Sequence, residues 1–202
     1  MRLSQLVGRR AALTLTCGAL QLAACDDANG DTTPPADDPY DGAFAACTRA
    51  ELEADMLVFD AQGNPSPPRW SGPAADPVTG ELTLDSGSYF VSTTYLALRP
   101  EQNDAFFALL GPVQAALFSN PGMLAVQLGS SQSCATARTY TVWRDETAMF
   151  EFVNSDAHLA AIAGFPGISR GDSTVTSWAE TSPAAITWEA ALTQLASAAA
   201  YD

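Results

Sequence analysis

The sequence predicts an α+β fold in which one antiparallel sheet carries two helices on the same face. Stretches rich in β-branched and aromatic residues mark four strands, and apolar residues at helical spacing mark the helices between them. Between residues 88 and 180 the order is strand, helix, strand, strand, helix, strand. This βαββαβ order is that of a ferredoxin-like sheet.

The first strand and first helix have the clearest patterns. Residues 88–98, SYFVSTTYLAL, have strand composition and length. The helix that follows begins near Pro100, which suits a first turn, and Gly111-Pro112 should kink it. Its apolar face consists of Phe106, Leu109, Leu110, Val113 and Leu117.

The remaining elements follow without long gaps. Residues 121–129 and 137–143 predict two strands, residues 145–164 a helix, and residues 172–180 the fourth strand. A terminal helix over residues 186–199 has Thr187 as its expected N-cap and Glu189 in its first turn.

The N-terminal residues 1–24 have the layout of a secretory signal. Three arginines precede an apolar stretch, Ala11 to Ala24, which is too short to span a bilayer as a helix. The stretch ends in Leu22-Ala23-Ala24-Cys25, which resembles the lipobox of bacterial lipoproteins. We therefore expect a lipid anchor at Cys25 and a place in the bacterial cell envelope, on the inner or outer membrane, facing the periplasm or the outside. A plain signal peptide cleaved near Ala24 is the alternative.

Two segments separate this signal from the predicted sheet. Residues 25–42 are rich in aspartate, proline and glycine and predict a flexible acidic tether. Residues 43–87 predict an irregular wrap, with a short helix over residues 48–56 and a hairpin turn at Val78-Thr79-Gly80. Trp70 is expected to pack this wrap onto the following domain.

Charge and cysteine content restrict the partners. Without the signal, the chain has six arginines, no lysine and 23 acidic residues. This negative charge excludes nucleic acid as a partner. Cys17 leaves with the signal and Cys25 takes lipid, so Cys47 and Cys134 remain and are expected to form a disulfide. The cysteines and the single histidine have no metal-site spacing, so we expect no metal and no cofactor.

The predicted sheet has a second face that its two helices cannot cover. Alternate residues in the strands over 121–129 and 137–143 are apolar on both faces. A second copy of the sheet would cover the bare face, which predicts a two-fold homodimer.

Residues 89–180 resemble the antibiotic-biosynthesis-monooxygenase-like (ABM) domains of the dimeric α+β barrel group. The resemblance rests on PGMLAVQLG, over residues 121–129, and on TVWRDETAMFEFVNSDAHLAA, over residues 141–161. It implies a pocket between sheet and helices, near Thr93, Tyr95, Trp143, Phe152 and Ile162. The group includes cofactor-independent quinone-forming monooxygenases, heme-degrading monooxygenases and domains without demonstrated catalysis.

The heme-degrading members use an asparagine, a tryptophan and a histidine ligand. The matching positions here hold Thr93, Phe152 and Ile162, so the resemblance disfavours heme degradation.

His158 admits two interpretations. In one continuous helix over 145–164, Asp156 would fall in the apolar stripe, which is costly. A break at Asn154 or Ser155 would place Asp156 in the first turn of a second helix and His158 at its third position, in a capping or packing role. Alternatively, His158 is a catalytic acid or base, or a ligand contact, in the pocket.

Three functions remain open from the sequence. The first is an anchored lipoprotein whose ABM-like domain binds a small apolar molecule without established catalysis. The second is a cofactor-independent monooxygenase acting on an aromatic or quinol. The third is a structural envelope dimer.

Overall fold

Four antiparallel strands form the main sheet in this computed structural model, in the order β4-β5-β3-β6. They are β3 (Tyr89–Ala97), β4 (Met123–Ser131), β5 (Thr136–Trp143) and β6 (Thr174–Glu180). The structure describes residues 40, 42–59, 65–66 and 68–200. The predicted signal, Cys25 and nearly all of the tether lie outside the described residues.

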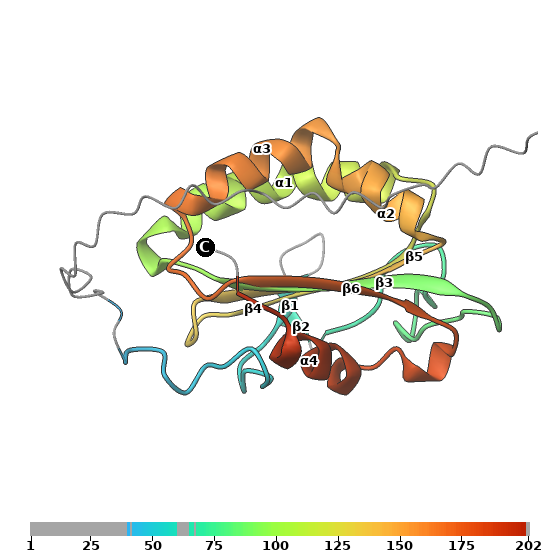
Figure 1. Cartoon of the computed structure of the whole chain (residues 1–202), viewed down its shortest axis with the longest axis horizontal. Coiled ribbons are helices and arrows are strands. Elements are labelled where there is room, and N and C mark those ends of the chain that lie inside the picture. Colours follow the sequence, from blue (N-terminus) through green and yellow to red (C-terminus); the bar gives the residue numbers. More distant parts are fainter. Residues whose placement is uncertain (1–39, 41, 60–64, 67, 201–202) are drawn as a thin grey trace, which may run out of the picture. The chain divides into compact units, whose positions relative to one another are not determined.

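Helices α1 (Asn103–Ser119), α2 (Glu146–Val153) and α3 (Asp156–Gly164) lie over one face of this sheet (Figure 1). Short 3-10 turns precede α1 (η1, Pro100–Gln102) and follow α3 (η2, Phe165–Gly167). The α+β fold with ferredoxin-like strand order is therefore confirmed.

The predicted long helix over 145–164 is two helices. Asp145 caps α2 by accepting from the backbone N–H of Ala148, and Ser155 caps α3 by accepting from the backbone N–H of His158. Asp156 lies in the first turn of α3. The break relieves the conflict that a buried carboxylate would have caused, because Asp156 is exposed.

The other face of the sheet is covered by the chain itself, so the expectation of a bare face is wrong. Helix α4 (Trp188–Ser197), which Thr187 caps as expected, lies against this face together with the N-terminal segment (Figure 1). The cover is largely aromatic and aliphatic, and its partly buried members are Trp70, Leu82, Leu84 and Trp188. They pack on a buried core of Val91, Ala125, Tyr140 and Val142. The argument for a dimer through this face therefore no longer holds.

The wrap differs from its prediction in one part. Residues 48–56 form turns instead of a helix, because Arg138 takes the backbone carbonyls of Thr48 and Glu51 as hydrogen-bond acceptors. The hairpin turn at 78–80 is present, with Ala75 bridged to Leu82. Trp70 packs on Tyr140 as expected, with ring centroids 5.0 Å apart.

The wrap also completes the edge of the sheet. Strands β1 (Val58–Phe59) and β2 (Pro65–Ser66) pair with each other. Leu57 bridges Ser130, and Ser71 bridges Val126, so two positions of the edge strand β4 are paired. A disulfide joins Cys47 to Cys134, as the cysteine content predicts.

No helix among the described residues is long and apolar enough to cross a membrane. The short turn η3 (Pro183–Ala185) leads from β6 into α4.

Candidate functional site

A strip of hydroxyl side chains runs across the helix-facing side of the two central strands. Ser92 and Thr94 project from β3, and their direct neighbours Thr141 and Thr139 project from β5. The Oγ of Ser92 and the Oγ1 of Thr141 are 2.8 Å apart, and the Oγ1 atoms of Thr94 and Thr139 are 2.9 Å apart. We call these four residues the hydroxyl strip.

The hydroxyl strip stays accessible to solvent although it lies in the middle of the sheet. Ser92, Thr94 and Thr139 are half-buried, and only Thr141 is buried. On the neighbouring strand β6, the helix-facing residues Val175 and Ser177 are exposed. Central positions under a tightly packed helix layer would be fully buried. The helix layer therefore does not bury this part of the sheet completely.

Few side chains of the helices over the hydroxyl strip are buried. Among its 17 residues, all of them described, α1 buries only Leu117. Helix α3, also described in full, buries none. The buried contacts lie at both ends of the layer. At one end Ala148 and Met149 of α2 pack against Met123 and Trp143, and at the other Phe106 and Leu109 of α1 pack against a cluster that includes Ala137 and Ile168.

An aromatic group closes that end of the hydroxyl strip. Trp143 is buried at the end of β5, and its Nε1 donates to the Oγ1 of Thr141 at 2.9 Å. Phe152 stacks on Trp143 with ring centroids 5.3 Å apart. His158 also contacts Phe152, with ring centroids 4.7 Å apart.

His158 is held by the helix break. Its Nδ1 lies 3.1 Å from the carbonyl oxygen of Val153, which can only accept, so Nδ1 carries a proton and donates. Burial lowers the pKa of His158 below its usual value of 6.5, and the bond to Val153 opposes this shift. The imidazole is therefore neutral at pH 7, and Nε2 is the nitrogen that can accept a proton.

The structure does not bring the five predicted pocket residues together. Trp143 and Phe152 lie on the helix side, whereas Thr93 and Tyr95 lie on the opposite side of the sheet. Thr93 is buried and donates to the backbone oxygen of Thr139. Ile162 is 45% exposed on α3.

The error has a simple cause. Successive residues of a strand point to opposite faces, so the choice of Thr93 and Tyr95 selects the wrong parity. Their neighbours Ser92 and Thr94 face the helices. The large apolar residues Phe90 and Leu96 pack on the helix side, and their shared parity with Ser92 and Thr94 is a signal that could have identified the strip.

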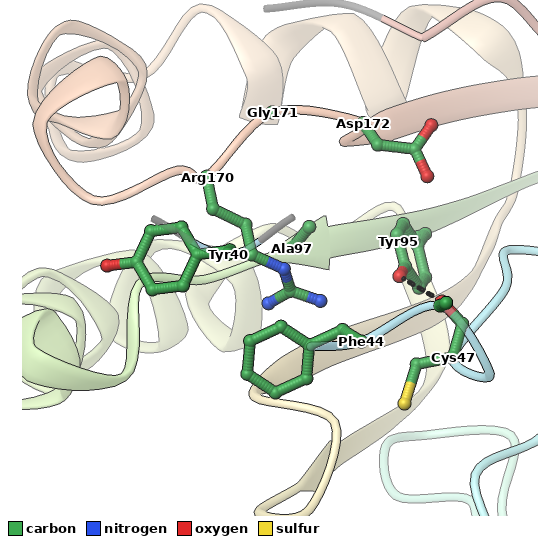
Figure 2. A pocket seen from close by; sticks show the side chains of 9 residues that line it. Tyr40, Phe44, Cys47, Tyr95, Ala97, Arg170, Gly171 and Asp172 are labelled. Atoms are coloured by element: carbon green, nitrogen blue, oxygen red, sulfur yellow. Dashed lines mark hydrogen bonds between the residues drawn. The ribbon is translucent and has the colours of Figure 1, made fainter. Parts of the chain in front are cut away.

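Tyr95 instead borders a small pocket of about 150 Å³ on the other side of the molecule. Figure 2 shows the side chains that line it: Tyr40, Phe44 and Cys47 from the N-terminal segment, Tyr95 and Ala97 from β3, and Arg170 and Asp172 from the loop before β6. Ligand pockets for drug-sized molecules usually exceed about 300 Å³. This pocket is too small for such a ligand.

The polar groups at this small pocket serve to attach the N-terminal segment. Arg170 donates to the carbonyl oxygens of Leu98, Ala135 and Cys134, and its guanidinium lies 4.1 Å from the ring centroid of Phe44. Tyr95 donates to the carbonyl oxygen of Cys47 at 2.9 Å. The pocket therefore marks a structural junction, and the hydroxyl strip with its aromatic end is the candidate site.

The described residues contain no group of three or more His, Cys, Asp or Glu side chains that could hold a metal ion. The candidate site offers hydroxyl groups, an indole and a neutral imidazole. Such groups suit hydrogen bonding and stacking on an uncharged planar molecule.

Comparison with known families now assigns the domain. Residues 89–164 match the family model "Antibiotic biosynthesis monooxygenase". The chain thus contains an ABM domain, with an N-terminal extension before it. A search of curated proteins gives no significant match.

Solved structures share low sequence identity with the chain. Rv0793 from Mycobacterium tuberculosis is 19% identical, with a TM-score of 0.43, over 46% of this chain and 96% of that chain. Protein SO0527 from Shewanella oneidensis is 14% identical, with a TM-score of 0.42, over 48% of this chain and 93% of that chain. A structure described as an antibiotic biosynthesis monooxygenase is 18% identical, with a TM-score of 0.41, over 44% of this chain and 95% of that chain.

Proposed function

We propose that the ABM domain binds a small, uncharged, planar molecule such as a quinone against the hydroxyl strip. The observation that carries this proposal is the solvent access of Ser92, Thr94 and Thr139 in the middle of a sheet that helices overlie. A face needed only for packing would carry large apolar side chains at these positions. Here it carries hydroxyl groups that can hydrogen-bond a carbonyl or phenol.

The chemistry of the ligand follows from the surroundings of the strip. Phe152 and Val175 provide apolar contact, and the hydroxyl pairs provide donors and acceptors at fixed positions. The absence of any lysine in the chain, and its formal net charge of −14, disfavour an anionic ligand. An uncharged aromatic carbonyl compound fits both conditions.

The probe for this proposal is menadione, an uncharged naphthoquinone, titrated into the full chain while tryptophan fluorescence is followed. We expect saturable quenching, because Trp143 closes the strip. In Ser92→Ala/Thr94→Val the dissociation constant should rise about tenfold, which corresponds to about 1.4 kcal/mol of lost hydrogen bonding.

A matched control tests the location. Thr193→Val removes an exposed hydroxyl from α4, on the opposite side of the sheet, and should leave the dissociation constant unchanged. Equal affinity in the double variant and the wild type, or quenching that rises linearly without saturation, would reject the proposal.

A second candidate function is cofactor-independent oxygenation at the same strip. The observation that favours it is the neutral imidazole of His158, whose Nε2 can take a proton from an acidic C–H or phenol. The deprotonated substrate would reduce O₂, with one oxygen atom entering the ring and the other leaving as water. Anthrone, which becomes anthraquinone and water by this balance, is a suitable probe.

Oxygen uptake measures this second candidate directly. The full chain with anthrone should consume O₂ faster than anthrone alone, and His158→Gln should lose most of the increase. If the wild type gives no increase in O₂ consumption, or if His158→Gln keeps the increase, the oxygenase hypothesis is rejected. The binding of menadione is tested separately.

We also propose that the protein is a lipoprotein anchored through Cys25 to a membrane of the bacterial envelope. The support is the sequence of residues 1–25, with its basic start, short apolar stretch and lipobox-like end. Expression in a bacterium fed an alkyne-tagged fatty acid should label the wild type. Cys25→Ala should lose the label and leave the membrane fraction, whereas Cys17→Ala should keep both. Labelling of Cys25→Ala would refute the anchor.

A further inference from the structure

Helices α1 and α3 pack side by side, and neither has a charged side chain beyond its first turn (Figure 1). Residues 105–119 of α1 and 157–164 of α3 contain no Asp, Glu, Lys or Arg. A helix that is apolar on all sides normally lies in the interior of a protein or in a membrane. The surroundings of these two helices therefore need an explanation.

Both helices expose large apolar side chains to solvent. Phe107 and Phe118 of α1 are 53% and 50% exposed, and Phe150 of α2 is 47% exposed. Leu159 and Ile162 of α3 are 46% and 45% exposed. We call these five side chains the helix-layer patch.

The two phenylalanines of α1 lie on one side of that helix. Phe107, Gly111, Ala115 and Phe118 follow one another at intervals of three or four residues, and all four are exposed. The residues between the two rings are small, so the rings project beyond them. Because α1 and α3 overlie the same face of the sheet, their exposed sides form one apolar surface (Figure 1).

The N-terminal segment meets the domain beside this surface. Tyr40 is the first residue that the structure describes, and its hydroxyl donates to a carboxylate oxygen of Glu101. Glu101 belongs to η1, which leads directly into α1. The chain that precedes Tyr40 therefore reaches the domain at the start of α1.

We propose that the helix-layer patch rests on the lipid bilayer to which Cys25 anchors the chain, an inference that depends on the proposed lipid anchor. Cys25 and Tyr40 are 15 residues apart. A flexible chain of this length spans about 20 Å on average and about 50 Å when fully extended. Helix α1, with 17 residues, is about 25 Å long. The anchor thus holds the start of α1 within about one helix length of the bilayer.

The anchor also makes a weak contact with lipid sufficient. A short flexible linker gives an effective concentration in the millimolar range, so the second contact needs little affinity of its own. A phenylalanine side chain presents roughly 200 Å², so the three half-exposed rings offer about 300 Å² for burial. Binding to a membrane interface grows with the apolar area that is buried.

The charges around the patch determine which lipids suit it. The exposed residues that border it are acidic, namely Asp104, Glu146, Glu151 and Asp156, and the whole chain has a formal net charge of −14. Helices that bind anionic membranes usually carry Lys or Arg beside their apolar face, and these helices carry none. Anionic headgroups would repel the acidic border. The proposed partner is therefore a bilayer surface of zwitterionic headgroups, held by apolar burial.

Quenching by brominated lipids tests this contact. The full chain carrying Cys17→Ala is coupled through the Cys25 thiol to a maleimide lipid, in vesicles of phosphatidylcholine brominated on its acyl chains. Phe118→Trp places a tryptophan in the patch, and its added fluorescence should fall by about half, because interfacial helices enter the headgroup boundary by about 5–10 Å. Val78→Trp, at a position 81% exposed in the hairpin turn of the wrap, is the matched control and should not be quenched.

A second pair of variants tests the role of the apolar side chains. Ile162→Trp reports from α3, and its quenching should disappear when Phe107→Glu/Phe118→Glu is added. Thr193→Glu, exposed on α4, should leave the quenching of Ile162→Trp unchanged. Circular dichroism of each variant shows whether the fold is retained, and the comparison of Phe118→Trp with Val78→Trp does not depend on the charged variants.

The lipid composition gives a further test. Replacement of part of the phosphatidylcholine by phosphatidylglycerol should reduce the quenching of Phe118→Trp, and added salt should restore it, because salt screens the repulsion. Quenching that increases with phosphatidylglycerol would overturn the proposal.

Chemical coupling separates this test from that of the anchor. The maleimide lipid replaces lipidation by the cell, so a failure of fatty-acid labelling at Cys25 would reject the anchor without changing the quenching result. Equal quenching of Phe118→Trp and Val78→Trp would overturn the contact proposed here. Quenching that survives Phe107→Glu/Phe118→Glu, or that appears only when vesicles are densely loaded with protein, would do the same.

Discussion

Arg138 and Glu53 form an ion pair that water does not reach, although 85 residues separate them in the chain. The Nε of Arg138 lies 3.0 Å from an Oε of Glu53, and their side chains are 0% and 1% exposed. The Nη2 of Arg138 also donates to Glu53, and both Nη atoms donate to backbone carbonyls of the wrap, including those of Thr48 and Glu51. One arginine on β5 thus fixes the N-terminal segment on the sheet.

Removal of one partner should be strongly destabilising. Glu53→Gln leaves the Arg138 charge buried without its counterion, which costs about 3–5 kcal/mol in the free energy of unfolding. Urea denaturation followed by circular dichroism measures the change. Arg144→Ala removes a pair with Asp145 whose side chains are 58% and 47% exposed, and it should barely move the midpoint. A loss for Glu53→Gln as small as that for Arg144→Ala would contradict the buried pair.

The disulfide should add to this attachment. Cys47 and Cys134 are 87 residues apart, and closing a loop of that size in the unfolded chain stabilises the folded state by about 4–5 kcal/mol in the chain-entropy model. Cys47→Ala/Cys134→Ala should lower the denaturation midpoint, and a reductant should do the same to the wild type. The double variant should not respond to the reductant. Equal midpoints for the oxidised wild type and the variant would refute this prediction.

The sequence predicts well the features that depend on one segment of the chain, and less well the contacts between distant segments. The strands, the caps at Ser155 and Thr187 and the break before Asp156 are local patterns, and all are present in the structure. The cover on the second face depends on contacts between distant segments, such as Trp70 with Tyr140. No periodicity within one segment encodes such a contact, which is why the sequence suggested a bare face.

The candidate site was likewise predicted only in part. The pairing of Trp143 with Phe152 joins two elements that are adjacent in the chain, and the resemblance placed both at the pocket. The choice between Thr93 and Thr94 depends on which parity of β3 faces the helices. Both parities of this strand carry polar and apolar residues, and other parts of the chain pack on both faces of the sheet. The alternation alone therefore does not decide it.

The single histidine allows a direct test of the helix break. Because burial lowers the pKa of His158, the unfolded chain binds a proton more readily than the folded one. The stability that the neutral imidazole contributes is present above pH 6.5 and is lost as the pH falls from 6.5 through the folded-state pKa. NMR titration of the imidazole should give a pKa below 6.5. In His158→Gln this part of the pH dependence should vanish, and a measured pKa at or above 6.5 would contradict the burial described here.

Removal of the Tyr140 hydroxyl group should stabilise the folded protein. Its ring lies at the centre of the second face, with ring centroids 5.0 Å from Trp70 and 5.4 Å from Trp188. The side chain is buried, and its hydroxyl finds no hydrogen-bond partner among the described residues. Burial also raises the pKa of Tyr140 well above its usual value, so the phenol stays neutral. Tyr140→Phe keeps the ring contacts and should raise the free energy of unfolding by about 1 kcal/mol.

Tyr95 provides the control for this prediction, because Tyr→Phe at that position should change the free energy of unfolding in the opposite direction. Tyr95 is equally buried, but its hydroxyl donates to the carbonyl oxygen of Cys47. Tyr95→Phe removes that hydrogen bond and should lower the free energy of unfolding by about 1 kcal/mol. Urea denaturation of both variants under the same conditions gives the two signs. If Tyr140→Phe proves as destabilising as Tyr95→Phe, the Tyr140 hydroxyl must be hydrogen-bonded in solution, and the tight aromatic packing of the second face would need revision.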